Sequence, residues 1–279
     1  MSHLVSILVR SKNDESFVAA TLRAIFDQEC DIPFEVICCD DASTDRTPEL
    51  IATFPQATML PRPPGEYYPG QRLNYMVAHS RGDLIVFNNA DAIPQNHHWL
   101  QKLIAPLLDH SADAAYGNQL PRPNAEWLVR KDHLRAFGDG RIAAQWRFFF
   151  SLATAAAWKR DLLEHPFDET IRYSEDVEWA HRRPIRIAYA PEALVEHSHN
   201  YTLAQLRRRF HGEGEADARI FGPTPLWREL ASALRETLRD FAYLLPRPRG
   251  WHELPLAPIR RLTQRYCHWK GGRAHGQHA

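Results

Sequence analysis

The sequence lacks several features that would assign the chain to a specialised class of protein. Its 34 Lys and Arg residues equal its 34 Asp and Glu residues, so it has no overall basic charge of the kind that nucleic-acid binders carry. No window of about 18 apolar residues is present to predict a membrane-spanning helix. The first residues show no basic segment followed by a long apolar one, as a secretion signal would. We therefore expect a globular protein that binds no nucleic acid and spans no membrane.

Cysteine is also scarce. The chain has four cysteines, and no pair has the C-x-x-C spacing of a zinc or redox site. Cys38 and Cys39 lie in the apolar run of residues 34–39, where cysteine behaves as a small buried hydrophobe. This use of cysteine favours a reducing compartment, and we expect the protein in the cytoplasm.

The first half of the chain alternates short apolar runs with amphipathic stretches. This pattern is typical of a largely parallel sheet covered by helices. The apolar runs predict strands over residues 4–9, 34–39, 57–60, 83–87, 114–116 and 185–190. Helical spacing and helix-start signals predict helices over residues 15–28, from 47, over 71–80, from Pro94 to 108, over 154–163 and from 174.

The end of the chain has a different character. Beyond residue 201 the sequence becomes helical in pattern and rich in arginine, and prolines interrupt it from residue 246 onwards. We therefore expect a sheet domain over residues 1–205, with halves of about 1–95 and 96–205, and a basic helical extension over 206–279.

Polar residues directly follow several of the predicted strands. In an open α/β sheet, ligands bind beyond the carboxyl ends of the strands. Asp40 and Asp41 follow the second strand, Asn89 and Asp91 follow the strand at 83–87, and Asp176 stands in the acidic step that opens a later helix. We expect Asp91 and Asp176, distant in sequence, to converge on one cleft.

Four motifs, in order, resemble those of family 2 glycosyltransferases. They are VSILVRSKNDESFVAATLRAIFDQ with FEVICCDDASTDRT, then NNADAIPQNHHWL, then FDETIRYSEDVEWAHR, and then EHSHNYT, which resembles a motif of a subset related to bacterial rhamnosyltransferases. The resemblance implies the GT-A fold, a Rossmann-like mixed central sheet flanked by helices, here with a C-terminal helical extension. It further implies an inverting enzyme of surface polysaccharide synthesis. Such an enzyme moves a sugar, for example rhamnose, from a nucleoside-diphosphate sugar to a hydroxyl of a glycan or lipid-linked acceptor.

The resemblance also implies which residues hold the sugar donor. Asp40 and Asp41 suit a uracil or thymine imide and a ribose hydroxyl, which favours a UDP or dTDP donor. The alternative is a plain turn, in which Asp, Ser and Thr are common. The full set of donor-binding residues implied is Arg10, Lys12, Asp40, Asp41, Arg72, Asn89 and Arg182.

A divalent cation is implied at Asp91, where oxygen ligands would help to neutralise the departing diphosphate. His197 and His199, two apart on an extended segment, share a face and would complete a site for Mn²⁺ or Mg²⁺. Asn89 departs from the family's pattern, which has an acid at this place, and an amide brings no charge. That departure favours a modest affinity for metal. It also favours the alternative function, a non-catalytic scaffold of the same fold that binds a glycan or a partner enzyme.

The acceptor hydroxyl needs a base, and the resemblance implies Asp176 for that role. Glu175 would orient the acceptor or the start of the helix, and Trp179, one turn further on, would supply an apolar wall. The alternative is that both acids only favour a helix N-terminus through its dipole. A nucleotidyltransferase is disfavoured, because no glycine-rich phosphate loop follows the first strand.

The C-terminal segment from residue 244 to 279 contains seven Lys or Arg residues against Glu253 alone. Aromatic and aliphatic residues, among them Trp251, Ile259 and Tyr266, are interleaved with the charges. This composition suits contact with the anionic inner face of the cell membrane. A solvated helical arm that joins two copies of the chain into a homo-oligomer is the alternative.

Overall fold

The computed structural model describes residues 3–146 and 148–275. They form two compact units. The first comprises Met1–Arg122, Arg135–Thr170 and Glu175–His197, and the second comprises Pro123–Leu134, Ile171–Ser174 and Ser198–Ala279. The second unit therefore includes residues 123–134, 171–174 and 198–205, which the sequence assigns to the sheet domain.

The first unit is built on an eight-stranded sheet in the order β3-β2-β1-β4-β7-β6-β8-β5. Strands β3, β2, β1 and β4 run parallel to one another, whereas β7 lies antiparallel to both β4 and β6. The predicted mixed central sheet is confirmed. The strands span Val5–Ser11 (β1), Phe34–Asp40 (β2), Ala57–Leu60 (β3), Leu84–Asn89 (β4), Ile93–Pro94 (β5), Ala114–Leu120 (β6), Thr154–Trp158 (β7) and Ile187–Glu196 (β8).

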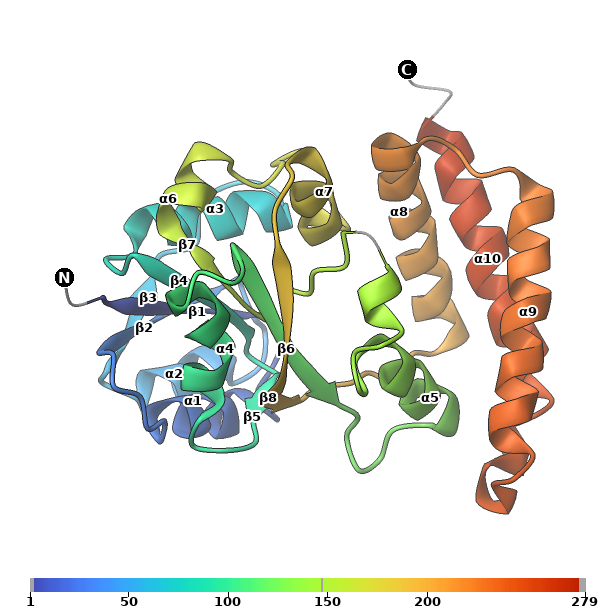
Figure 1. The fold of residues 1–279 in the computed structure, drawn as a ribbon, viewed down its shortest axis with the longest axis horizontal. Coiled ribbons are helices and arrows are strands. Elements are labelled where there is room, and N and C mark those ends of the chain that lie inside the picture. Colours follow the sequence, from blue (N-terminus) through green and yellow to red (C-terminus); the bar gives the residue numbers. More distant parts are fainter. Residues whose placement is uncertain (1–2, 147, 276–279) are drawn as a thin grey trace. The chain divides into compact units, whose positions relative to one another are not determined.

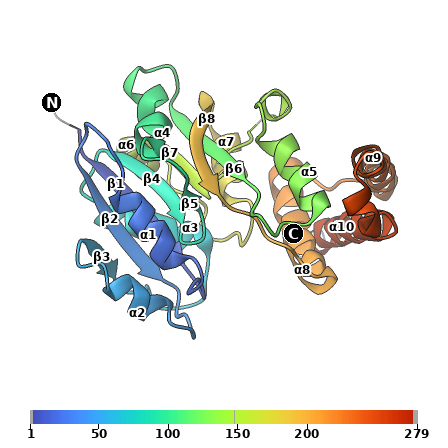
Figure 2. The same ribbon diagram turned by 90° about the horizontal axis from the view of Figure 1, so that it is seen from below.

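Helices cover both faces of this sheet because the central strands are apolar on both sides. In β1, Val5, Ile7 and Val9 enter one core cluster, while Leu8 enters the other. Figures 1 and 2 show the two helical layers. One contains α1 (Val18–Phe26), α2 (Thr47–Ala52) and α4 (Trp99–Leu108), and the other contains α3 (Pro69–His79), α6 (Lys159–Glu164) and α7 (Glu175–Arg182).

Two predicted helices are wrong in part. Residues 154–158 form the strand β7 instead of opening a helix, and only α6 follows it. Three alanines favour a helix by intrinsic propensity, but all five residues of β7 are buried between β4 and β6, so tertiary packing decides. Pro94 lies in β5, the last strand of the sheet, and α4 begins at Trp99. Proline is tolerated at a sheet edge, where its missing N–H is not needed.

Gly117 marks a register shift in the pairing of β6 with β8. A Cβ atom at this position would lie 2.5 Å from the carbonyl oxygen of Ala193, so only glycine fits. Beyond the shift, Gln119 pairs with Val195. The irregularity thus sets the register with which the last residues of β6 run beside the strand that leads to His197.

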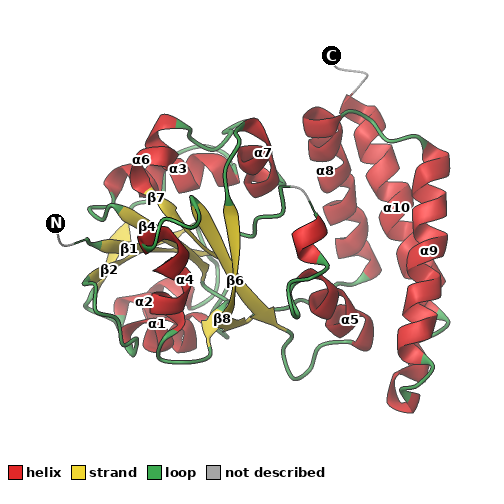
Figure 3. Cartoon of the chain, in the orientation of Figure 1, coloured by secondary structure: helices red, strands yellow, loops and turns green. Residues whose placement is uncertain are grey.

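The second unit is helical, as Figure 3 shows for α8, α9 and α10. Thr202 and Gln205 form a reciprocal capping box at the start of α8. Gly214 lets α8 and α10 approach closely, because a Cβ there would lie 1.9 Å from the carbonyl oxygen of His268. Among the described residues, no helix has the length and apolar character needed to cross a bilayer. The elements are α8 (Leu203–Phe221), α9 (Leu226–Leu244), η2 (Pro248–Glu253), α10 (Leu256–His275) and most of α5 (Trp127–Ala136), while η1 (Ala143–Gln145) belongs to the first unit.

A buried ionic network holds α5, α9 and α10 together. The Asp240 carboxylate is fully buried and lies 2.6 Å from Lys131 Nζ and 2.7 Å from Arg261 Nε. We expect Asp240→Ala to lower the free energy of unfolding by about 3–5 kcal/mol, since removing one partner leaves buried cations undercompensated. Urea unfolding followed by circular dichroism measures the change. Asp139→Ala, which removes an exposed ion pair with Arg141, is the matched control and should change stability by less than about 1 kcal/mol.

Candidate active site

The carboxyl ends of β1, β2 and β4 meet at one edge of the sheet, because the three strands are parallel neighbours. In this register Ser11 pairs with Asp40, and Arg10 pairs with Asn89. Segments that the sequence singled out separately are thereby brought side by side.

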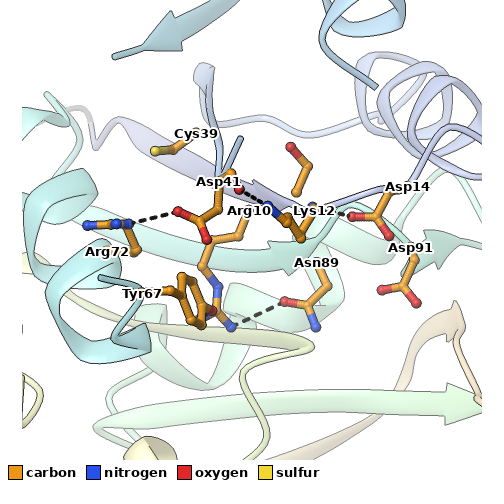
Figure 4. Close-up of a pocket in the computed structure, with 10 residues that line it drawn as sticks. Arg10, Lys12, Asp14, Cys39, Asp41, Tyr67, Arg72, Asn89 and Asp91 are labelled. Atoms are coloured by element: carbon orange, nitrogen blue, oxygen red, sulfur yellow. Dashed lines mark hydrogen bonds and ion pairs between the residues drawn. The ribbon is translucent and has the colours of Figure 1, made fainter. Parts of the chain in front are cut away.

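A pocket of about 170 Å³ opens at this edge (Figure 4). Most of the predicted donor-binding residues line it, together with Asp91, the predicted metal ligand. Its walls combine cationic, carboxylate and amide groups with one aromatic ring, a composition suited to a charged polar ligand. The lining residues are Arg10, Ser11, Lys12, Asp14, Cys39, Asp41, Tyr67, Arg72, Asn89 and Asp91.

One wall of the pocket is made by Asp41 and the buried Arg72. Arg72 is 2% exposed, and its Nε lies 3.3 Å from Asp41 Oδ1. Lys12 Nζ donates to the backbone carbonyl oxygens of Asp41 and Ala42. Two cations thus fix the loop after β2, and they bring positive charge to the pocket.

Asp40 and Asp41 have different surroundings. The Asp40 carboxylate accepts hydrogen bonds from Ser11 Oγ at 2.8 Å, from Ser43 N at 2.8 Å and from Ser43 Oγ at 2.6 Å. It is not among the residues that line the pocket. Ala42 adopts a φ of 54° in the reversal that follows. Asp40 therefore holds the turn, and Asp41 is the acid of the pair that faces the pocket.

Arg10 connects the pocket to the acidic start of α7. Its Nη2 lies 3.4 Å from Asn89 Oδ1, and its Nη1 lies 3.5 Å from Glu175 Oε1. Asn89 stands two residues before Asp91, and Glu175 directly precedes Asp176. One guanidinium thus contacts both regions, around Asp91 and around Asp176, that we expected from the sequence to converge.

Asp176 lies in the first turn of α7 and is largely shielded from solvent. Its Oδ1 accepts a hydrogen bond from Val177 N at 2.9 Å. Burial, and next the negative charge of Glu175, raise the pKa of Asp176 to about 7. A carboxyl group with that pKa can both accept and release a proton near neutral pH.

The apolar wall predicted for Trp179 belongs to the core behind this turn. Trp179 is 1% exposed, and its ring stacks on Phe150 with centroids 5.5 Å apart. The ring of Phe167 packs against the Trp179 ring, with centroids 5.7 Å apart. These aromatic contacts anchor α7, so the acidic step at its start is held on a rigid element.

Asp91 sits among polar partners beyond the end of β4. It is 6% exposed, and its Oδ1 lies 3.5 Å from His197 Nε2. The other ring nitrogen of His197 lies 2.8 Å from Gln119 Oε1, which orients the ring. Arg122 Nη2 donates to the Asp91 carbonyl oxygen at 2.5 Å and lies 3.3 Å from Oδ2.

The Asp91 and His197 pair fits a divalent cation. Oxygen and nitrogen ligands lie roughly 2.0–2.2 Å from a first-row ion, so two of them on one ion stand roughly 3.0–3.6 Å apart. The observed separation of 3.5 Å falls in this range. His199 belongs to the second unit, and its role as a further ligand stays a prediction.

A sequence model of a known family matches residues 6–167, which is more than half of the chain, and its description is glycosyl transferase family 2. The chain belongs to this family. It is a glycosyltransferase, and the predicted family membership is confirmed.

Two curated relatives of this glycosyltransferase resemble it over nearly their full length. The O-antigen chain rhamnosyltransferase WbaN of Salmonella anatum is 26% identical, covering 88% of this chain and 89% of the relative. The O-antigen chain rhamnosyltransferase RfbN of Salmonella typhimurium is 24% identical, covering 95% of this chain and 96% of the relative.

Solved structures show the fold. The mannosyltransferase PcManGT of Pyrobaculum calidifontis, solved with GDP-Man and Mn²⁺, superimposes with a TM-score of 0.63 at 21% identity over 94% of this chain and 86% of that one. Glucosyl-3-phosphoglycerate synthase of Mycobacterium tuberculosis, solved with Mn²⁺ and UDP, gives 0.59 at 21% identity over 80% of both chains. The predicted GT-A fold with a helical C-terminal region is confirmed.

Some residues around the glycosyltransferase site escaped the sequence analysis. Asp14 lines the pocket, and burial, reinforced by the charge of Asp91, raises the pKa of Asp14 to about 6. Arg122 and Gln119 hold Asp91 and His197. Arg122 follows a strand in a proline-rich stretch, and no motif marks either residue. Their polar character next to a strand end was the available signal.

The structure does not bring Arg182 to the pocket. Its Nε lies 2.6 Å from Glu178 Oε1, and its Nη2 donates to the carbonyl oxygen of Pro166 at 2.7 Å. Arg182 stands at the far end of α7 from Asp176. We therefore give it no role in donor binding.

Proposed function

We propose that this glycosyltransferase transfers a sugar, with inversion, from a nucleoside-diphosphate sugar to a hydroxyl of a glycan or lipid-linked acceptor in surface polysaccharide synthesis. Both curated relatives carry the description O-antigen chain rhamnosyltransferase, which supports this acceptor class and rhamnose as the sugar. The observation that carries the proposal is the position of Arg10, within 3.5 Å of both Asn89 and Glu175. The enzyme would act in the cytoplasm, the compartment that its cysteine usage favours.

The donor would occupy the pocket at the strand ends. Arg10 and Lys12 line it and carry the positive charge that a diphosphate needs. Asp41, held by Arg72, is an acceptor for a base imide or a ribose hydroxyl, which suits UDP or dTDP.

Asp91 and His197 would hold the cation. His199, two residues after His197, would be its third ligand. An imidazole ligand favours Mn²⁺ over Mg²⁺. A divalent cation bound there would offset the charge on the departing diphosphate. Asn89 supplies no charge, while the neighbouring Asp14 adds a carboxyl group to the pocket.

Asp176 would act as the base. Its carboxylate takes the proton of the acceptor hydroxyl while the acceptor oxygen forms a bond to the anomeric carbon. The bond from that carbon to the diphosphate oxygen breaks, and the electron pair leaves with the diphosphate. Attack from the side opposite the leaving group inverts the anomeric centre.

The pH dependence of the reaction follows from the raised pKa of Asp176. The base must be ionised, so kcat/KM should fall about tenfold for each pH unit below about 7. In Glu175→Gln the neighbouring negative charge is absent, which should lower the pKa of Asp176. The fall in kcat/KM on the acid side of the profile, its acid limb, should then shift to lower pH. A pH profile of kcat/KM measures both. An acid limb that stays in place in the variant would argue against Asp176 as the titrating base.

Release of nucleoside diphosphate tests the proposed function. The chain is first screened by thermal shift against UDP, dTDP and GDP sugars with Mn²⁺, because a ligand of the folded state raises the melting temperature. Donors that bind are then assayed for diphosphate release with lipid-linked and free glycan acceptors. Sugar transfer to an acceptor would support the proposed enzymatic function. Donor or glycan binding without transfer or hydrolysis under any condition would favour the non-catalytic scaffold.

A further inference from the structure

Helix α9 is amphipathic in the reverse of the usual sense. Its outward side carries Trp227, Leu230, Leu234 and Leu238, which are 65%, 44%, 62% and 58% exposed. In an ordinary surface helix the apolar stripe faces the core and the polar side faces water. The side chains that α9 buries are largely polar: Glu229, Ala233, Glu236, Thr237, Asp240 and Leu244.

Helix α10 repeats this arrangement beside α9, with which it packs. It buries Arg260 and Arg261, and it exposes an apolar row at spacings of three and four residues. Both helices turn their polar sides to α5, since Lys131 pairs with Asp240 and Asp132 pairs with Arg261. The apolar rows therefore both face away from α5. We call them, with Trp251 of η2, the outer face: Trp227, Leu230, Leu234, Leu238, Trp251, Leu256, Ile259, Leu262 and Tyr266.

The charges around the outer face have one sign. Between residues 222 and 275 all four acidic side chains are buried, and each has partners inside the unit. Eight basic side chains in the same stretch are half-buried or exposed. The acids are Glu229, Glu236, Asp240 and Glu253, and the bases are Arg228, Arg235, Arg239, Arg247, Arg249, Arg265, Lys270 and Arg273.

We propose that the outer face binds the surface of a bilayer that contains anionic lipids. Apolar side chains of an interfacial helix enter the boundary between headgroups and acyl chains, and tryptophan and tyrosine suit that depth. Arg228 and Arg235, seven residues apart, lie along one flank of the α9 row, from which their guanidinium groups reach lipid phosphates. Each such charge near an anionic surface adds to the attraction.

Charge favours a bilayer over a second copy of the chain. Two copies joined through this face would bring their basic side chains together, and residues 222–275 offer no exposed acid to pair them. An anionic headgroup layer complements both the apolar rows and the charge. The inference extends the sequence-based expectation for residues 244–279 to α9, and it does not rest on the proposed reaction.

Vesicle sedimentation tests the inference. The full chain is mixed with vesicles of phosphatidylcholine alone, or of phosphatidylcholine and phosphatidylglycerol at 3:1. We expect partitioning at least about tenfold stronger onto the anionic vesicles, decreasing with salt. Leu234→Glu with Leu238→Glu should reduce it at least about tenfold. Leu163→Glu in α6, where the leucine is 55% exposed, is the matched control and should bind like the wild type.

A second variant separates charge from folding. Arg228→Gln with Arg235→Gln keeps every leucine, and it should lose most of the preference for anionic over neutral vesicles. Wild-type chain that stays in the supernatant with both vesicle types would overturn the proposal. So would a dimer in gel filtration that the Leu234→Glu, Leu238→Glu variant converts to a monomer, because a second copy would then cover the outer face. Sedimentation needs no sugar donor, so its outcome is independent of turnover.

Discussion

Asp176→Asn is expected to lower kcat by about 10²–10⁴ while leaving the affinity for the nucleotide donor within about threefold of the wild type. The amide cannot take the proton of the acceptor hydroxyl, so the variant loses the base. The side chain keeps its shape at the start of α7, where Oδ1 accepts a hydrogen bond from Val177 N. Steady-state assays of diphosphate release, with donor binding by calorimetry, measure the two effects separately.

Glu178→Gln is the matched control for this result. Glu178 lies on the same helix but pairs with Arg182, away from the pocket. It should keep kcat within about threefold, since it loses one ion pair of the kind that contributes less than about 1 kcal/mol. If Asp176→Asn retained most of the wild-type kcat, the two acids of α7 would be left as helix-start residues and another base would be needed.

Asp91→Ala is expected to abolish stimulation by Mn²⁺ and to lower kcat/KM by about 10²–10³. The substitution removes the only charged ligand of the proposed cation site in the first unit, and it leaves His197 with its contact to Gln119. Titration of Mn²⁺ into the assay, from chelator-treated protein, measures the loss.

Asp109→Ala, at an exposed position after α4, serves as the control and should respond to Mn²⁺ as the wild type does. His197→Gln should fall between the two, because it removes a neutral ligand and keeps the carboxylate. Full stimulation by Mn²⁺ in Asp91→Ala would place the cation elsewhere. It would leave Asp91 with its ion pair to Arg122 as its only role at the site.

Much of the first unit was predictable because its strands are continuous apolar runs that end in polar residues. Residues 36–39 and 84–87 of these runs are buried on both faces, so their continuous apolar character leaves little choice of structure. Parallel order then places their polar ends together, which is why Asp41 and Asp91, both singled out from sequence, line one pocket. Asp40 shows what the sequence leaves open. Its position at a strand end, next to Asp41, does not tell which of the two acids faces the pocket.

Other elements depend on contacts between distant residues. The alanines of β7 favour a helix until β4 and β6 enclose them. The role of Arg122 can be recognised only from the Asp91 carboxylate, which lies 3.3 Å from its Nη2. The apolar spacing of α9 predicts a helix, but spacing alone cannot say that the polar side is the buried one.

Anomalous scattering from a crystal of the full chain grown with Mn²⁺ and the nucleoside diphosphate that binds most tightly tests the central claim most directly. We predict an anomalous peak about 2.0–2.6 Å from an Asp91 carboxylate oxygen, with the diphosphate between that ion and Arg10, and Asp176 on the far side of the cleft. A bound nucleotide with its ion away from Asp91, or a nucleotide in a pocket that Asp176 does not share, would contradict it.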